Sequence, residues 1–294
     1  MKANFSLLDY LKWPIHYLFA PLGENTFPKI ETKRVLNNST PNIKVSFIGD
    51  LMGIGEKRVL VNDDLKFYLN NSDLIIGNLE CIISDQVKIN LKNQVTSHYS
   101  LSSFKNNIST RLAVSLANNH SMDNGVFGLE NTIKSLNTLK IDYFGTRHKP
   151  FLGINSQFKI LAATQWSGKE ISSLSSLHEL SVDCIPNNII PYFHIGDEFF
   201  STLSNEDLDE IIKLTKNNNM PFIGHHSHVI HEPHFYQDRM FFSSLGDFWV
   251  SYGSMHIKKG IVLTLEFSDD QLCSLEWRKT KCCCTGDSVL ISFL

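Results

Sequence analysis

The sequence predicts an α/β fold, because short apolar runs that end in polar or glycine-containing turns alternate with segments of helical period from Lys44 onward. The chain has 294 residues, 42% of them hydrophobic and 19% charged, so it can bury a sizeable core. The expected strands cover residues 44–48, 74–76, 112–116, 142–144, 159–163, 189–193, 221–224, 239–243 and 260–267. Helices are expected over 128–139 and 205–217, the second with Ser204 or Asn205 as N-cap.

A shift in composition divides the chain into an N-terminal arm, residues 1–43, and a domain that carries the chemistry, residues 44–294. Charged residues and Pro14 interrupt the apolar stretch 7–22 of the arm, so neither a signal peptide nor a transmembrane segment is predicted. We therefore expect a cytoplasmic protein. Two interpretations of the arm stay open: it packs on its own domain, or its aromatic residues contact a membrane surface. These aromatic residues are Tyr10, Trp13, Tyr17 and Phe19.

Charge and cysteine content narrow the range of partners. The formal net charge is −3 and no Lys/Arg block is present, so nucleic acid is not an expected partner. The spacing of the six cysteines matches neither a zinc ribbon nor a disulfide framework. For the run 282–284, unpaired thiols, acylation and metal binding remain open.

Residues 84–107 and 167–180 are rich in Ser, Asn and Lys, and we expect them to form loops over a site.

Several polar residues come directly after apolar runs that should be buried strands. Asp50 ends the stretch VSFIGD, Glu80 ends DLIIGNLE, and Asn119 and His226 follow two later strands. A carboxylate or imidazole buried at a strand end costs free energy unless it is paired, and a divalent cation can pair with several of them at once. Glycine turns are expected before both carboxylates. Asp50 alone would equally fit a helix cap or a turn.

The stretch LAVSLANNHSMDNG is the most specific local signal. It places Asn118, Asn119, His120 and Asp123 within a short turn after an apolar strand. An amide oxygen in this position can face a cation or a substrate, and Asp123 can orient the imidazole of His120. The alternative is that Asn118 and Asp123 cap the following helix.

Histidines cluster after the strand expected at 221–224. A His-x-His pair, His226 and His228, places two side chains on the same side of an extended chain, where both can reach metal positions. A nonspecific metal-binding surface is the alternative. His194 also follows a strand and precedes a glycine. The full tract contains His225, His226, His228, His231 and His234.

Taken in order, these stretches resemble the CapA family of bacterial capsule and poly-gamma-glutamate synthesis proteins, a branch of the calcineurin-like metallophosphoesterases. The resemblance extends from Lys44 to about Phe267. It rests on the motifs GDxMxG, NLE, LANNHxxDxGxxGL, HxGxE, and HxH followed by YxxxxxxxSLGxF, which occur here in this order. The last four match in spacing, whereas the first reads GDLMG, with its second glycine one position earlier.

The resemblance implies a double β-sheet sandwich flanked by helices, in four αββα layers, with two divalent transition metals (zinc, manganese or iron) at the strand ends. It implies that Asp50, Glu80 and His228 hold one metal. Glu80 would bridge to the second metal, which Asn119, His194 and His226 would also bind. His120 would assist the leaving group or stabilise the charged transition state. We therefore expect His120 and Asp123 as the catalytic pair.

The chain departs from the pattern of the wider superfamily at its first motif, where Asp-x-His is expected and Met52 stands in place of the histidine. One metal site therefore has a ligand fewer. Ser227 replaces a common Pro and Ile195 a common Trp. The expected function is a metal-dependent hydrolase acting on an anionic polymer or a phosphorylated small molecule. The alternative is a non-catalytic factor that binds a capsular polymer through its metals. His120 favours catalysis, because a purely structural metal site needs no proton donor.

Overall fold

The computed structural model describes residues 26–53, 55–85, 94–166, 173–181, 185–251 and 257–294. In this part of the chain the larger of two main sheets has ten strands. Eight of them follow in the order β3 (Arg58–Val61), β18 (Ser288–Phe293), β17 (Leu272–Thr285), β16 (Lys259–Phe267), β2 (Ile43–Met52), β4 (Leu74–Leu79), β7 (Arg111–Ser115) and β8 (Asp142–Phe144). The other two are β1 (Lys33–Val35), which pairs with β17, and β15 (Asp247–Val250), which pairs with β2.

The smaller sheet has six strands within the described residues. Their order is β13 (His234–Tyr236), β14 (Arg239–Phe242), β12 (Phe222–His225), β11 (Ile189–His194), β10 (Lys159–Thr164) and β9 (Phe151–Gly153). The strands β10, β11, β12 and β14 run parallel, as do β2, β4, β7 and β8 of the larger sheet. A short two-stranded ladder, β5 (Ile82–Ile83) and β6 (Val95–Thr96), lies beside the larger sheet.

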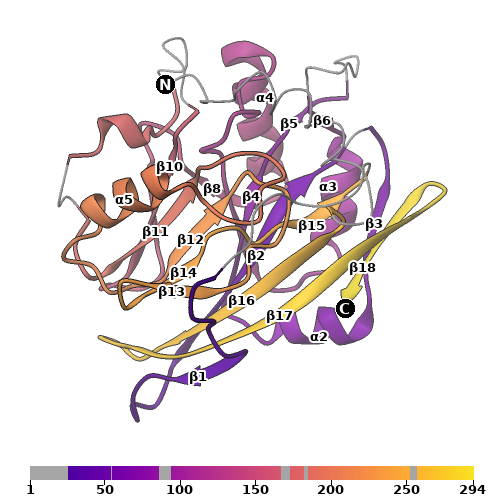
Figure 1. The fold of residues 1–294 in the computed structure, drawn as a ribbon. Helices are drawn as coiled ribbons and strands as arrows, with labels where there is room; N and C mark the ends of the chain where they lie inside the picture. Colours follow the sequence, from indigo (N-terminus) through magenta and orange to yellow (C-terminus); the bar gives the residue numbers. More distant parts are fainter. Residues whose placement is uncertain (1–25, 54, 86–93, 167–172, 182–184, 252–256) are drawn as a thin grey trace.

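The two sheets pack face to face, and helices cover their outer faces (Figure 1). Phe47 of β2 and Tyr192 of β11 belong to the apolar cluster between the sheets. A second cluster joins the larger sheet to α2 (Asp63–Asn70), α3 (His98–Lys105) and α4 (Gly125–Thr138). A third joins the smaller sheet to α5 (Asn205–Leu214). These layers confirm the α/β sandwich flanked by helices, because each sheet buries one face against the other sheet and one against helices.

All nine expected strands and both expected helices are present, with ends that shift by a few residues. Ser204 is the N-cap of α5, and its hydroxyl accepts a hydrogen bond from the backbone N–H of Asp207. The expected loop 84–107 is wrong in part, because its second half forms α3. Ser97 caps this helix, and Leu101 and Phe104 bury its inner face.

The strands β17 and β18 were not expected, and β17 contains the cysteine run. Successive residues of a strand face opposite sides of the sheet, so Cys282 is buried whereas Cys283 is exposed. The described cysteines are all free thiols. Of the other expected loop, residues 167–172 lie outside the described part, and Leu177–Glu179 forms a short 3-10 helix.

The described end of the N-terminal arm lies against the domain. Ile30 is buried in the cluster between the sheets, Phe27 stacks on His234, and β1 adds to the edge of β17. The boundary at residue 44 stays a prediction. Residues 1–25, with the four aromatic residues proposed for membrane contact, lie outside the described part. Among the described helices, none is both long and apolar enough to cross a membrane.

Candidate metal centre

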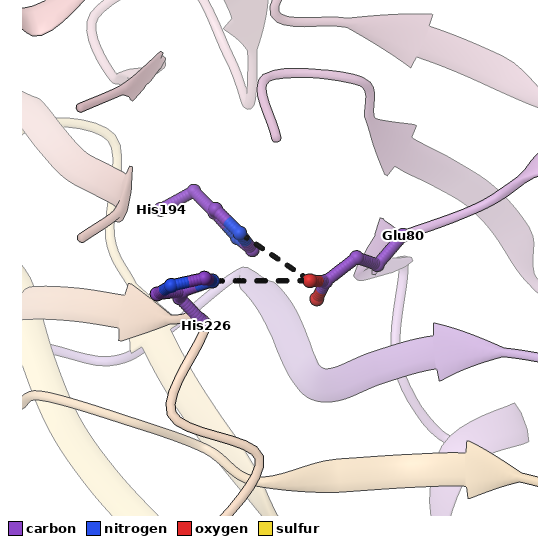
Figure 2. A group of neighbouring side chains, drawn as sticks. All are labelled: Glu80, His194 and His226. Atoms are coloured by element: carbon purple, nitrogen blue, oxygen red, sulfur yellow. Dashed lines mark ion pairs between the residues drawn. The ribbon is translucent and has the colours of Figure 1, made fainter. Parts of the chain in front are cut away.

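The candidate site lies where the carboxyl ends of parallel strands from both sheets meet. Asp50 comes from β2 and Glu80 follows β4, whereas His194 ends β11 and His226 follows β12. Figure 2 shows the side chains of Glu80, His194 and His226 pointing toward one another. Because the carboxyl ends of parallel strands form one edge, residues far apart in the sequence meet there.

An irregularity in β2 gives Asp50 its direction. The pairing of β2 with β4 shifts register between Phe47 and Asp50, and such a bulge re-aims the following side chain. Gly49 forms no turn here, contrary to expectation: it lies within β2, where a Cβ would be 2.1 Å from the carbonyl oxygen of Gly246. Gly77 likewise lies within β4. The two strands therefore continue to the carboxylates, and Asp50 is neither a helix cap nor a turn former.

The first group of candidate ligands contains Glu80, His194 and His226, all buried. Glu80 Oε1 lies 3.4 Å from His194 Nε2 and 4.0 Å from His226 Nδ1. Asn119 Oδ1 lies 2.8 Å from the same Nε2 of His194. Tetrahedral zinc with bonds of 2.0–2.2 Å separates its ligand atoms by about 3.4 Å. The 3.4 Å separation matches this value, the 4.0 Å separation exceeds it, and the 2.8 Å separation is a hydrogen-bond distance. Glu80, His194 and His226 therefore surround a position that could hold one metal ion.

The second group contains Asp50, Glu80 and His228, also buried. Asp50 Oδ2 lies 3.8 Å from His228 Nδ1, and Glu80 Oε1 lies 3.6 Å from His228 Nε2. Glu80 thus belongs to both groups. The structure brings together all six residues expected as ligands, in the two sets that the family resemblance implied; metal binding itself stays a prediction.

The backbone at the histidine pair is strained. His226 has φ 101° and His228 has φ 60°, a region that only a few per cent of non-glycine residues adopt. Because β12 ends at His225, strand alternation is not what aligns the pair, and the expected reason was wrong. Residues held in such conformations cost on the order of 1–3 kcal/mol each and cluster at functional sites.

Three of the ligand atoms lack hydrogen-bond partners within the described residues. Asp50 Oδ2, Glu80 Oε1 and His226 Nδ1 are buried without one. Leaving a buried polar atom unsatisfied costs about 1–3 kcal/mol, and more for a charged group. A divalent cation would satisfy all three, so the donor set fits two metals that share Glu80.

Burial shifts the protonation of the first group. Burial raises the pKa of Glu80 well above its usual range, and the neighbouring charges of Asp50 and Asp247 raise it further. The charge of His228 lowers it. Burial also lowers the pKa of His194 and of His226 well below the usual value. Neutral imidazoles are the form that binds metal, so the two histidines are ready to act as ligands.

The second group is governed by ion pairing. Burial opposes the charged form of His228, but Glu80 and Asp247 outweigh it and raise the pKa of this histidine well above its usual value. Burial likewise raises the pKa of Asp50, yet the charge and hydrogen bond of His225 outweigh it and lower that pKa. Burial raises the pKa of Asp247 to about 7. A proton on His228 therefore competes with a metal for the same carboxylates.

His120 and Asp123 form a pair at the edge of the site. His120 Nδ1 lies 2.9 Å from Asp123 Oδ2, which also accepts a hydrogen bond from the backbone N–H of Gln94. The His120 side chain is 18% exposed, unlike the buried carboxylates and histidines of the two ligand groups. Asp123 does hold this imidazole, as expected; the catalytic roles stay predictions.

Neither Asn118 nor Asp123 caps the next helix, so that alternative was wrong. The N-cap of α4 is Asn124. Asn118 Oδ1 instead accepts hydrogen bonds from the backbone N–H groups of His120 and Ser121. It therefore shapes the turn that carries His120.

Four further residues at the site were missed. His225 Nδ1 donates to Asp50 Oδ1 at 2.6 Å, and Asn78 Nδ2 donates to the same oxygen at 2.9 Å. Asp247 lies 3.1 Å from His228, and the ring of Trp166 lies 4.8 Å from that of His226. Asn78 was detectable, since it lies two residues before Glu80 and residues i and i+2 of a strand share a face.

The histidine tract splits into two parts, which argues against a nonspecific metal-binding surface. His225, His226 and His228 lie at the site. His231 Nε2 donates to the carbonyl oxygen of Phe200, and burial lowers the pKa of His231 to about 4. His234 stacks on Phe27 and Phe241. The last two histidines therefore support packing.

Comparison with known families supports the motif assignment. The family model for bacterial capsule synthesis protein PGA_cap matches residues 44–178. No curated protein matches the chain. The matched part contains Asp50, Glu80, Asn119 and His120, and the CapA resemblance noted in the motifs agrees with it. Over residues 44–178 the chain is thus similar to the bacterial capsule synthesis proteins, which is consistent with the metallophosphoesterase superfamily.

Proposed function

We propose that this protein is a metal-dependent hydrolase with a binuclear centre of manganese, zinc or iron. One observation carries the proposal: two buried groups of ligand atoms overlap at Glu80, and three of these atoms, Asp50 Oδ2, Glu80 Oε1 and His226 Nδ1, lack hydrogen-bond partners within the described residues. A cluster of this kind is costly to fold, so it is best explained by ions that it binds.

Two bound metals would supply Lewis-acid activation of the substrate and a hydroxide formed from water. The chain's own residues would then manage protons and charge. Asp123 holds Nδ1 of His120, which leaves Nε2 as the ring atom available to a substrate. The partial exposure of His120 places this atom where it can protonate a leaving group or stabilise developing negative charge.

The proposed substrate is anionic: a capsule-type polymer such as poly-gamma-glutamate, or a phosphoester. The match to the capsule synthesis protein family supports the polymer, and the metallophosphoesterase-like ligand set supports the phosphoester. Both reactions develop negative charge beside the metals, so the same residues would serve either. We propose that the reaction takes place in the cytoplasm.

A binding role is the second candidate, and Met52 favours it. The side chain at this position is buried in the core cluster between the larger sheet and its helices, so it supplies no ligand where the superfamily has a histidine. A centre short of one ligand can hold an anionic polymer for a separate synthase without hydrolysing it. Catalysis would then be absent.

The deciding experiment measures metal content and turnover together. The full chain is reconstituted with Zn²⁺, Mn²⁺ or Fe²⁺, its metals are counted by elemental analysis, and it is tested on aryl phosphoesters and gamma-glutamyl peptides. Turnover by a protein with about two metals per chain supports the hydrolase. Metal-dependent binding of poly-gamma-glutamate without turnover of either substrate class would replace it by the binding role. Less than half a metal per chain would overturn both.

A further inference from the structure

Asp247 is a fully buried carboxylate that stands behind the Asp50–Glu80–His228 group. It is the first residue of β15 and pairs with Asp50 of β2. The ladder shifts register directly after it, between Asp247 and Trp249. As at Asp50, an irregularity in the strand directs an acidic side chain toward the site.

The contacts of the His228 ring define which nitrogen carries the proton. Nδ1 lies 3.1 Å from Asp247 Oδ1, within hydrogen-bond distance, but 3.8 Å from Asp50 Oδ2. A carboxylate can only accept, so in the neutral, metal-binding form of the ring the proton lies on Nδ1 and is donated to Asp247. The other nitrogen, Nε2, lies 3.6 Å from Glu80 Oε1. The ring atom that faces the shared carboxylate is therefore Nε2.

We propose that Asp247 is a positioning residue of the metal centre: its carboxylate holds His228 in the Nδ1–H form and so presents Nε2 to the metal beside Glu80. The inference rests on the proposed function, because it requires a metal in the Asp50–Glu80–His228 group. A carboxylate behind a ligating histidine fixes the ring and raises the basicity of the coordinating nitrogen.

Met52 makes this support more important for the present chain. Because Met52 lies in the apolar core, His228 is the one imidazole in the ligand group of Asp50. Asp50 is itself held by His225 and Asn78. Asp247 gives His228 the corresponding support, so each non-shared ligand of this group is fixed by a neighbour.

The test compares the wild type with Asp247→Asn and Asp247→Ala. The first removes the charge with little change of shape, and the second also removes the acceptor. The matched control is Asp207→Asn, because Asp207 is a buried carboxylate whose hydrogen bonds go to Ser204 and Gln165 in the layer around α5. Each full-length protein is titrated with Co²⁺, and the visible absorption of the bound ion reports each site separately.

We expect both Asp247 variants to bind one of the two ions about 10- to 100-fold more weakly, since loss of an outer-shell partner typically has this effect. The second ion and the control should match the wild type. A further readout is the proton resonance of His228 Nδ1–H in the Zn²⁺ form, assigned by its loss in His228→Gln. It should be present in the wild type and absent in Asp247→Ala.

The outcomes separate the inference from the proposed function. A wild type that fails to bind two Co²⁺ ions overturns the binuclear centre. A wild type that binds two ions, with unchanged affinities in folded Asp247→Asn, overturns the role of Asp247 alone. The Asn variant decides the question even if Asp247→Ala does not fold.

Discussion

The shared carboxylate of Glu80 gives a prediction in which metal binding and stability change in opposite directions. Glu80 is fully buried, and its Oε1 has no hydrogen-bond partner within the described residues. We therefore expect Glu80→Gln to bind neither metal but to be more stable than the wild type when both are metal-free. An active-site charge that destabilises the fold is the usual origin of such a trade-off.

The size of the effect follows from the cost of the unsatisfied carboxylate. A buried acceptor without a partner costs about 1–3 kcal/mol, and more when it is charged. For a domain of this size, a gain of about 1–3 kcal/mol corresponds to roughly 2–12 °C in Tm. Burial raises the pKa of Glu80 well above 4.5, so its favourable contribution exists below about pH 4.5 and is lost as the pH rises through the folded pKa. The advantage of the variant should therefore be small near pH 5 and larger near pH 8.

The assay is thermal unfolding in excess chelator at both pH values, with metal content measured before chelation. Glu179→Gln is the matched control: Glu179 is exposed and paired with Arg147, and we expect its loss to change stability by less than about 0.5 kcal/mol. The reasoning is refuted if metal-free Glu80→Gln melts below the wild type at pH 8. It is equally refuted if the variant keeps two metals.

Three other outcomes are expected. His120→Ala should lower the rate on the order of 100-fold with unchanged metal content, whereas Asp50→Ala should lose metal and activity together; equal turnover by wild type and His120→Ala would contradict this role. The raised pKa of His228 stabilises the metal-free fold below about pH 6.5 and this stability is lost as the pH rises, so the gain in Tm from saturating Zn²⁺ should grow from about pH 6.5 to about pH 8.5 in thermal scans. Deleting residues 1–40 should lower Tm, because the burial of Ile30 and the pairing of β1 with β17 are both lost. Loss of one such buried side chain costs about 2–5 kcal/mol, so an unchanged Tm would show that the arm does not contribute to the core.

The sequence predicted the central strands and the candidate ligands because both depend on local patterns. An apolar run with a polar residue at its end, such as the one before Asp50, indicates both a buried strand and a polar side chain at the end of that strand. The ten-strand order of the larger sheet could not be predicted in this way, since the pairing of β17 with β1 and of β16 with β2 joins segments that are distant in the sequence. The sequence of β17 contains cysteines and charged residues in place of a continuous apolar run, so its alternation of apolar and polar residues was not recognised as a strand.

The unpredicted parts of the site arise from backbone irregularities and long-range contacts. The register shift before Asp50 and the left-handed backbone of His226 and His228 follow from how strands meet, which no local motif encodes. Asp247 comes from a strand 19 residues after His228, and its role depends on the parallel pairing of β15 with β2. Only tertiary structure reveals that these two residues touch.

The two groups of ligand atoms come from both halves of the sandwich, since Asp50 and Glu80 lie in or directly after strands of the larger sheet, and the three histidines lie in or shortly after strands of the smaller one. Ions bound there would act as cross-links between layers that otherwise adhere through non-directional apolar packing. Metal binding would thus reduce local opening along the whole interface between the sheets. Amide hydrogens of β11 and β12 would then exchange more slowly in the loaded protein, well beyond the residues that touch the ions.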